Sequence, residues 1–267
     1  MPNNILRLLF IGDVIGKPGR HILKKHLSFL KESLKADFVI VNIENLAGGF
    51  GITEKTFNEI NNLGLIDAYT SGNHIWDKKE AEKFIENHNN ILRPANYPES
   101  VPGKGLITLE KNGKKLSVIN LLGRTLMKDC VECPFKYADL LIEKVNNTTN
   151  NIFVDFHAEA TSEKEAMGYY LNGRVSVVAG THTHVQTADN RVLGEGTAYI
   201  SDVGMTGNIE SIIGFNQKDV IEKFMTQMPR RFQVKDNGKK EIQGVFVTLE
   251  NSSGKSLTIE RIKYKDY

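Results

Sequence analysis

Short, almost uninterrupted apolar runs alternate with amphipathic helical patterns along most of this 267-residue chain. The first run, Ile5–Ile11, has the composition of a strand that is covered on both faces. The segment that follows it carries Leu23, Leu27, Leu30 and Leu34, a spacing that lines one face of a helix. This alternation predicts α/β layers, in which each apolar run is a buried strand.

The same pattern continues to the C-terminus. Further strands are predicted at 38–43, 67–70, 105–110, 115–121, 152–156, 175–179 and 197–201, and further helices at 53–63, 77–86, 134–145, 161–171 and 218–225. The Asn112–Gly113 pair predicts a tight hairpin between two of these strands. Near the C-terminus we expect a hairpin of 232–235 with 244–249 and then a strand at 256–262, so that antiparallel strands lie at an edge or in a second sheet. No linker or repeat interrupts the chain, which predicts one domain over residues 1–267.

Composition excludes several classes of protein. The chain is 40% hydrophobic and 25% charged, as is usual for a globular protein, and it is long enough to bury a large core. Its formal net charge of +2 is too close to zero to indicate general nucleic-acid binding. No apolar run approaches the roughly 20 residues of a membrane span, and the N-terminus lacks the pattern of a signal peptide. We therefore expect a cytoplasmic protein.

Polar residues suited to metal binding or acid–base chemistry follow several of the predicted strands. In open α/β sheets, ligands bind beyond the carboxyl ends of the strands, so these residues are expected to meet in one crevice. They comprise two carboxylates, two carboxamides and four of the seven histidines: Asp13, Glu44, Asn45, Asn73, His74, His157, His182 and His184.

The i, i+2 pair of His182 and His184 is the most informative part of this set. Directly after an apolar strand, such a pair can point both rings into one crevice, and imidazole suits transition metals. The whole set contains more ligands than a single tetrahedral zinc can bind. Two metals about 3.5–4 Å apart that share a carboxylate would use all of these ligands. Taken singly, Asp13 could instead be a helix N-cap, His157 a core histidine and Asn73 a turn residue.

Five sequence blocks carry a family resemblance. They are FIGDVIGKPGR (10–20), GNHIWDKK (72–79), RPAN (93–96), DFHAEATSEK (155–164) and GTHTHVQTADNR (180–191). Together they resemble the calcineurin-like metallophosphoesterases and, over nearly the whole chain, the bacterial YmdB-type phosphodiesterases. The superfamily usually has Asp-x-His after its first strand and an Asp that bridges the metals. This chain has Ile15 in place of that histidine and offers Glu44 as the bridge, and both departures match the narrower family.

This resemblance implies a fold, a ligand set and a reaction. The fold is a four-layer α/β/β/α sandwich. One metal would be held by Asp13, Glu44, Asn45 and His184, and the other by Glu44, Asn73, His157 and His182. A metal-bridging hydroxide would attack phosphorus while His74 protonates the departing oxygen. The implied substrate is a small cyclic nucleotide, with the 2′,3′ ring favoured.

The metals are expected to be two Fe or Mn ions, because imidazole and carboxamide ligands outnumber carboxylates and Mg²⁺ prefers oxygen-only sites. Arg93, Asn96 and Arg191 are weaker candidates for substrate contact, because guanidinium pairs bidentately with phosphate. Any one of them could instead belong to a structural ion pair. Asp155 and Asp202 could orient the histidines or serve only as buried structural groups.

Two alternative functions stay open at this stage. One is a broader nuclease or phosphomonoesterase with the same metals, and the other is a regulatory scaffold with little turnover. The sequence also leaves open a homo-oligomer, the native metal, the base preference, the physiological partners and the role of Cys130 and Cys133. No second cysteine pair accompanies these two, so the sequence favours plain loop cysteines over a zinc site.

Overall fold

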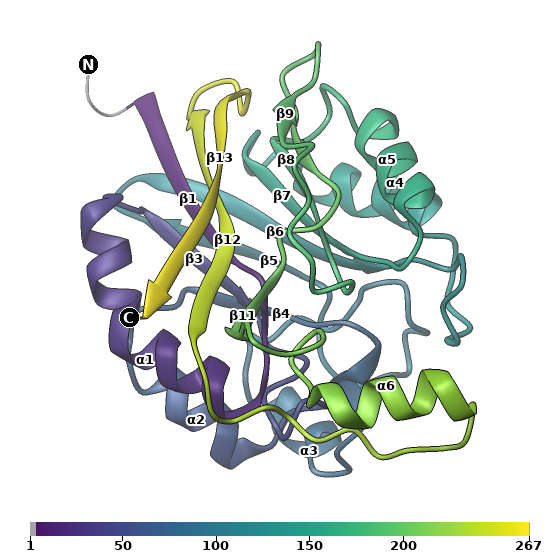
Figure 1. The fold of residues 1–267 in the computed structure, drawn as a ribbon. Helices are drawn as coiled ribbons and strands as arrows, with labels where there is room; N and C mark the ends of the chain where they lie inside the picture. Colours follow the sequence, from purple (N-terminus) through teal and green to yellow (C-terminus); the bar gives the residue numbers. More distant parts are fainter. Residues whose placement is uncertain (1–3, 267) are drawn as a thin grey trace.

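The strands of this protein form two sheets, seen in the computed structural model, which describes residues 4–266 (Figure 1). The part of the signal-peptide argument that concerns residues 1–3 lies outside the described residues. The first sheet has the order β2 (Asp13–Val14), β11 (Met205–Asn208), β12 (Lys240–Glu250), β1 (Ile5–Ile11), β3 (Phe38–Asn42) and β4 (Ala68–Thr70), and β13 (Ser256–Asp266) pairs with β12. The second has the order β5 (Leu106–Lys111), β6 (Lys114–Leu122), β7 (Ile152–His157), β8 (Val177–Thr181), β10 (Ala198–Ile200) and β9 (Arg191–Val192).

Helices cover the outer faces of both sheets: α1 (Gly16–Ser33), α2 (Glu54–Asn61) and α3 (Ala81–Glu86) pack on the first, and α4 (Pro134–Val145) and α5 (Thr161–Tyr170) on the second. The chain also forms α6 (Gln217–Thr226) and a short 3₁₀ helix at Asn73–Trp76. In Figure 1, α1 and α2 lie on one side of the two sheets, and α4 and α5 lie on the other.

Three hydrophobic clusters lie between four layers, which are two sheets and a layer of helices on each side. The first joins α1, α2 and α3 to the outer face of the first sheet through residues such as Leu27 and Val39. The second lies between the two sheets, where Phe10 and Phe153 meet with ring centroids 4.7 Å apart. The third joins the second sheet to α4 and α5, with Met167 fully buried. This arrangement confirms the predicted α/β/β/α sandwich.

Each sheet contains a run of adjacent parallel strands. β1, β3 and β4 run parallel in the first sheet, and β6, β7, β8 and β10 run parallel in the second. The carboxyl ends of the parallel strands therefore meet at one edge of each sheet, and the loops that leave them carry the polar residues predicted for the site.

The predicted C-terminal hairpin is wrong. β12 pairs with β1 on one side and with β13 on the other, so an antiparallel strand lies inside the first sheet rather than at its edge. Most residues of β12 are buried, as is usual for a strand inside a sheet. The segment 232–235 contributes one isolated bridge, between Val234 and Phe215.

Two local predictions have clearer outcomes. The hairpin of β5 and β6 is confirmed, and its turn residues Asn112 and Gly113 both have positive φ (51° and 73°), as a type I′ turn requires. The helix predicted at 77–86 is shorter, because the chain first forms the 3₁₀ turn at Asn73–Trp76 and α3 begins only at Ala81. Among the described residues, none of the helices combines the length and apolar character that crossing a bilayer requires.

Candidate metal centre and active site

The loops after five strands bring the predicted metal ligands together. Asp13 follows β1, Glu44 and Asn45 follow β3, and Asn73 follows β4 in the first sheet. His157 is the last residue of β7, and His182 and His184 follow β8 in the second sheet. The two sheets thus supply the two halves of one site, in agreement with the prediction that these residues meet in one crevice.

Two groups of side chains in this site have the spacing of metal ligands. Glu44, His157 and His182 offer ligand atoms that all lie within 4.8 Å of one another, and so do Asp13, Glu44 and His184. Glu44 belongs to both groups. Oδ1 of Asn73 lies 3.2 Å from Nε2 of His157, which adds a carboxamide oxygen to the first group. Asn45 lines the same cavity as Glu44, His182 and His184.

Buried oxygens without partners mark the places where cations would fit. Oδ1 of Asp13, Oε1 of Glu44 and Oδ1 of Asn45 are buried and accept no hydrogen bond. Leaving such acceptors unsatisfied costs about 1–3 kcal/mol each, and more when the group is charged. These three oxygens belong to residues of the predicted ligand set, so a cation held between them would satisfy all three. The donor set therefore fits the metals that the resemblance implies.

The charges of the site support the same conclusion. Burial raises the pKa of Asp13 well above its usual range. Burial also acts to raise the pKa of Glu44, but the facing imidazole of His157 outweighs it and the pKa falls below its ordinary value. For His157, burial acts to lower the pKa, but the carboxylate of Glu44 outweighs it and raises the pKa to about 9. Burial and the neighbouring His157 lower the pKa of His182 to about 3. A divalent cation would supply the positive charge that these buried carboxylates lack.

A chain of hydrogen bonds orients His157. Nδ1 of His157 lies 2.8 Å from Oγ1 of Thr181, and this hydroxyl donates to Oδ1 of Asp155 at 2.7 Å. Asn42 holds the other oxygen of Asp155 through its Nδ2 at 3.1 Å. With Nδ1 bound in this way, Nε2 of His157 faces Glu44 Oε1 at 3.2 Å. Ligating histidines commonly bind such a partner through the second ring nitrogen, so Asp155 acts as an orienting group.

The other two histidines are oriented by partners of their own. Nε2 of His182 lies 3.1 Å from Oε2 of Glu159, and its Nδ1 lies 3.0 Å from Nε2 of His157. Nδ1–H of His184 donates to the backbone carbonyl of Ile213 at 3.0 Å, which leaves its Nε2 on the side of Asp13, 3.9 Å from Oδ2. The structure thus selects Nδ1 of His182 and Nε2 of His184 to face the ligand groups.

The loop that carries both histidines has a strained backbone. His182 has φ of 101° and His184 has φ of 64°, in the region that favours glycine. Such residues cost of order 1–3 kcal/mol each and persist only where the surroundings hold them. Here Thr183 donates from its backbone N and its Oγ1 to Oδ2 of Asp202, at 3.0 and 2.8 Å. Asp202 is paired at 2.8 Å with Nζ of Lys164, and both side chains are only 1% exposed.

His74 lies beside the ligand groups but is not one of them. Its backbone N–H donates to Oε2 of Glu44 at 3.0 Å, and its Nδ1–H donates to Oδ2 of Asp77 at 2.8 Å. The edge of its ring meets Phe50, with centroids 5.0 Å apart. Its side chain is partly exposed and lines the same cavity as Glu44 and Asn45. His74 therefore has a fixed ring with one nitrogen free for chemistry.

Comparison with known proteins agrees with this geometry. Residues 9–262 match the model of a protein family described as YmdB-like protein. The chain belongs to the YmdB-like family. It is 50% identical to the 2′,3′-cyclic-nucleotide 2′-phosphodiesterase of Bacillus subtilis (strain 168), over 98% of each chain. The resemblance stated from the five sequence blocks is thereby confirmed.

Two solved structures have the same fold as this YmdB-like chain. The crystal structure of a hypothetical protein from Thermus thermophilus superposes with a TM-score of 0.91 at 37% identity, covering 98% of this chain and 100% of the other. The crystal structure described as a novel phosphatase from Mycoplasma pneumoniae gives a TM-score of 0.91 at 35% identity, covering 98% and 95%. This chain thus shares its α/β sandwich with both proteins.

The three predicted substrate contacts of this YmdB-like chain lie outside the cavity of the ligand groups. The guanidinium of Arg93 donates to four backbone carbonyls, among them that of Ala95 at 3.0 Å. Asn96 is fully buried and bonds the backbone of Leu122 in both directions. Arg191 pairs with Glu165 at 2.8 Å. Arg93 and Asn96 thus have structural hydrogen bonds, and Arg191 has a surface ion pair, while substrate contact by these three side chains stays a prediction.

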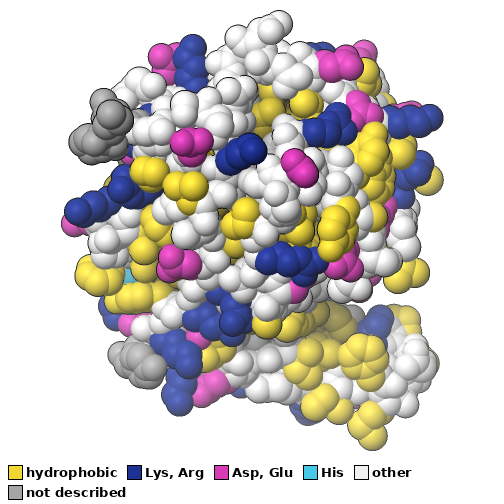
Figure 2. Space-filling model, turned by 90° about the horizontal axis from the view of Figure 1, so that it is seen from above, with side chains coloured by type: hydrophobic (Ala, Val, Ile, Leu, Met, Phe, Trp, Pro, Cys, Tyr) yellow, Lys and Arg dark blue, Asp and Glu magenta, His cyan; other side chains and the backbone are white. Residues whose placement is uncertain are grey.

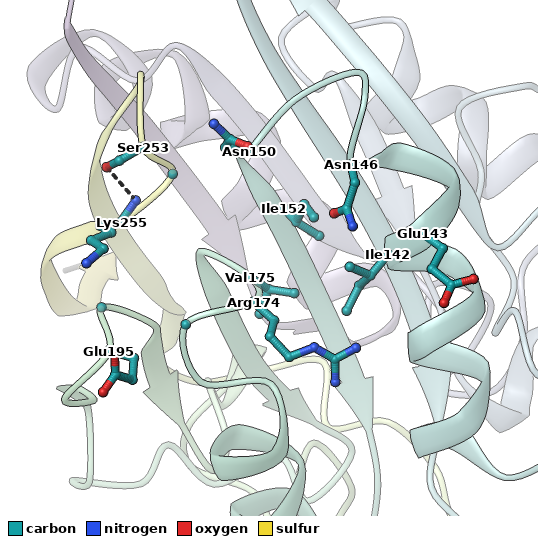
Figure 3. A pocket seen from close by; sticks show the side chains of 13 residues that line it. Ile142, Glu143, Asn146, Asn150, Ile152, Arg174, Val175, Glu195, Ser253 and Lys255 are labelled. Carbon is teal, nitrogen blue, oxygen red and sulfur yellow. Dashed lines mark hydrogen bonds between the residues drawn. The ribbon is translucent and has the colours of Figure 1, made fainter.

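A second cavity, of about 430 Å³, lies at the opposite ends of β7 and β8 (Figure 3). Ile152 and Val175, near the amino ends of these strands, form part of its wall, and Arg174, Glu195 and Lys255 surround it. None of the predicted site residues lines this cavity. This cavity and the ligand groups therefore lie at opposite ends of these strands.

Several residues of the site escaped the sequence analysis. Glu159, which orients His182, stands only two positions after His157, and its place in a loop directly after a strand could have indicated it. The others are apolar and line the same cavity as the ligand groups: Phe50, Ile213, Phe215 and Phe232. No pattern in the sequence distinguishes them from core residues.

Proposed function

We propose that this chain hydrolyses a phosphodiester bond with two divalent transition-metal ions, Fe or Mn, and that its substrate is a small cyclic nucleotide, with the 2′,3′ ring favoured. The observation that carries the proposal is the pair of ligand groups that share Glu44, next to His74 in one cavity. A shared carboxylate between two closely spaced ligand groups is typical of two-metal phosphoesterases.

The residues present divide into two ligand sets of four. Asp13, Glu44, Asn45 and His184 would hold one ion, and Glu44, Asn73, His157 and His182 would hold the other. Bound in this way, the ions would supply Lewis acidity that activates water and neutralises the charge of the phosphate.

His74 is proposed as the proton donor. Water gives up one proton to the solvent and its oxygen adds to phosphorus, the bond from phosphorus to one ribose oxygen breaks, and that oxygen takes a proton from protonated His74, which the solvent then reprotonates. The hydrogen bond to Asp77 fixes the imidazole, and the backbone bond to Glu44 keeps it next to the ligand groups. A positioned acid of this kind typically contributes about 10²–10⁴-fold to the rate.

The size and charge of the protein support a small substrate. The cavity of the ligand groups has a volume of about 310 Å³, at the lower end of the roughly 300–1,000 Å³ of small-ligand pockets. On the face shown in Figure 2, acidic and basic side chains are interspersed, and the net charge is only +2. A long polyanion would require a broad basic surface. The preference for the 2′,3′ ring rests on the name of the B. subtilis relative.

A substrate panel tests the proposal. The kcat/KM of the metal-loaded protein is measured with 2′,3′-cAMP, 3′,5′-cAMP, 5′-AMP and a single-stranded RNA oligomer at one metal concentration. We expect 2′,3′-cAMP to be preferred. We also expect Asp13→Asn to abolish turnover, because Asp13 belongs to only one of the two ligand groups and its carboxylate charge would be needed to hold that ion. A tenfold advantage of 5′-AMP or of the oligomer would indicate a phosphomonoesterase or a nuclease. Absence of turnover by the metal-loaded wild type would indicate a scaffold.

A further inference from the structure

We propose that Phe50, Ile213, Phe215 and Phe232, here called the apolar wall, bind the nucleobase of the substrate. The inference rests on the proposed function, since it assigns the part of the nucleotide that the metals and His74 do not touch. It explains why large apolar side chains line a cavity whose other lining residues are polar.

Two chemically different groups of residues line the cavity. The polar group comprises residues of the ligand groups and their neighbours: Glu44, Asn45, His74, Glu159, His182, Thr183 and His184. The second group is the apolar wall. A phosphate held at the ligand groups would leave the remainder of a nucleotide within reach of the wall, because the cavity of about 310 Å³ has room for one small ligand.

Hydrogen bonds from two candidate ligands place the wall. Nδ2 of Asn45 donates to the carbonyl of Gly49 at 2.9 Å, and Phe50 is the next residue. Nδ1–H of His184 donates to the carbonyl of Ile213 at 3.0 Å. Each of these two wall loops is therefore attached directly to a residue of the metal site. The distance between wall and ligand groups is set by the structure of the site itself.

The aromatic rings of the wall contact one another. The rings of Phe50 and Phe215 are stacked, with centroids 5.1 Å apart and planes at 18°, and Phe232 lies 5.5 Å from Phe215. Phe232 is brought there by backbone pairing, since the N–H of Asn216 donates to the carbonyl of Gln233 at 2.9 Å. At Gly49, any β-carbon would lie 2.8 Å from the ring of Phe215, so the close packing of the two loops requires glycine.

Stacking on such rings suits a nucleobase. Every base has a π-face, and its stacking on an aromatic side chain is tolerant of sequence. The wall's own side chains carry no hydrogen-bonding group, so the wall distinguishes nucleoside cyclic phosphates from cyclic phosphates without a base. It does not by itself distinguish one base from another.

Phe232→Leu is the test, because Phe232 is only partly buried and leucine keeps the apolar contact while removing the ring. Phe224→Leu is the matched control, since Phe224 lies on α6, is 70% exposed and does not line the cavity. For both variants, kcat and KM are measured with 2′,3′-cAMP and with glycerol 1,2-cyclic phosphate, which has the same five-membered ring and no base. Calorimetry with adenosine, which has no phosphate, measures binding to the wall with and without metal.

We expect Phe232→Leu to raise KM for 2′,3′-cAMP about tenfold, near the lower end of what loss of a stacked ring costs. Its constants for glycerol 1,2-cyclic phosphate should stay within about twofold of wild type, and adenosine should bind about tenfold more weakly. Phe224→Leu should change none of these values.

Equal losses on both substrates, or none on either, would overturn the inference while the proposed function stands. The inference is equally wrong if the wild type prefers the substrate without a base or binds no adenosine. If the wild type cleaves neither cyclic phosphate but does cleave 5′-AMP or RNA, the proposed function itself fails, and adenosine binding then reports on the wall independently.

Discussion

Replacing Lys164 by methionine tests how the strained loop of His182 and His184 is held. Methionine nearly fills the volume of the lysine stem but leaves Asp202 buried without its cation, and both side chains are only 1% exposed in the native pair. Removing one partner of a buried ion pair costs about 3–5 kcal/mol, because the other charge remains uncompensated. That is a large part of the roughly 5–15 kcal/mol by which a protein is stable.

The expected fall in Tm is about 6–20 °C, since a chain of this size loses roughly 2–4 °C for each kcal/mol. Asp202 also accepts two hydrogen bonds from Thr183, which lies between the two histidines. We therefore expect Lys164→Met to bind metal more weakly as well as to melt earlier. Scanning calorimetry measures the first effect on chelated protein, and elemental analysis after dialysis measures the second.

Lys115→Met is the matched control, because Lys115 pairs with Glu110 at 3.6 Å on the surface, where the side chains are 43% and 64% exposed. Exposed pairs of this kind contribute about 0–1 kcal/mol, so this variant should melt close to wild type. If Lys164→Met melts within about 2 °C of Lys115→Met, the reasoning from the buried pair is refuted. Normal metal retention in a destabilised Lys164→Met would refute the link to the histidine loop.

Three further outcomes are expected. Protein purified without chelator should contain close to two equivalents of Fe or Mn by elemental analysis, and a single zinc, or none after metal supplementation, would contradict the two ligand sets. Gly72→Ala should lose metal and activity, since a β-carbon there would overlap the imidazole of His157 and the carboxylate of Glu44; a fully loaded variant would contradict this geometry. His74→Ala should keep its metals and lose about 10²–10⁴-fold in kcat, less with a nitrophenolate leaving group that scarcely needs a proton, and equal losses on good and poor leaving groups would exclude the acid role.

Local patterns in the sequence predicted most of the strands and helices. Apolar runs such as Ile5–Ile11 and helical leucine spacings reflect short-range periodicity, which depends only on neighbouring residues. The same reasoning failed at 232–235, because strand pairing is decided by partners far away in the chain. β12 finds such a partner in β1, at the other end of the chain.

The sequence by itself determined which polar residues end the strands, since a ligand type directly after an apolar run is visible in one dimension. Only the tertiary structure decided that Glu44 belongs to both ligand groups and that Asp155 and Glu159 orient separate histidines. The tertiary structure likewise decided that the guanidinium of Arg93 donates to backbone carbonyls. It also decided that Phe232 lines the cavity of the metal ligands, which no periodicity could indicate. The physical reason is that these relations are distances between segments remote in sequence, and folding sets such distances through the packing of two sheets against each other.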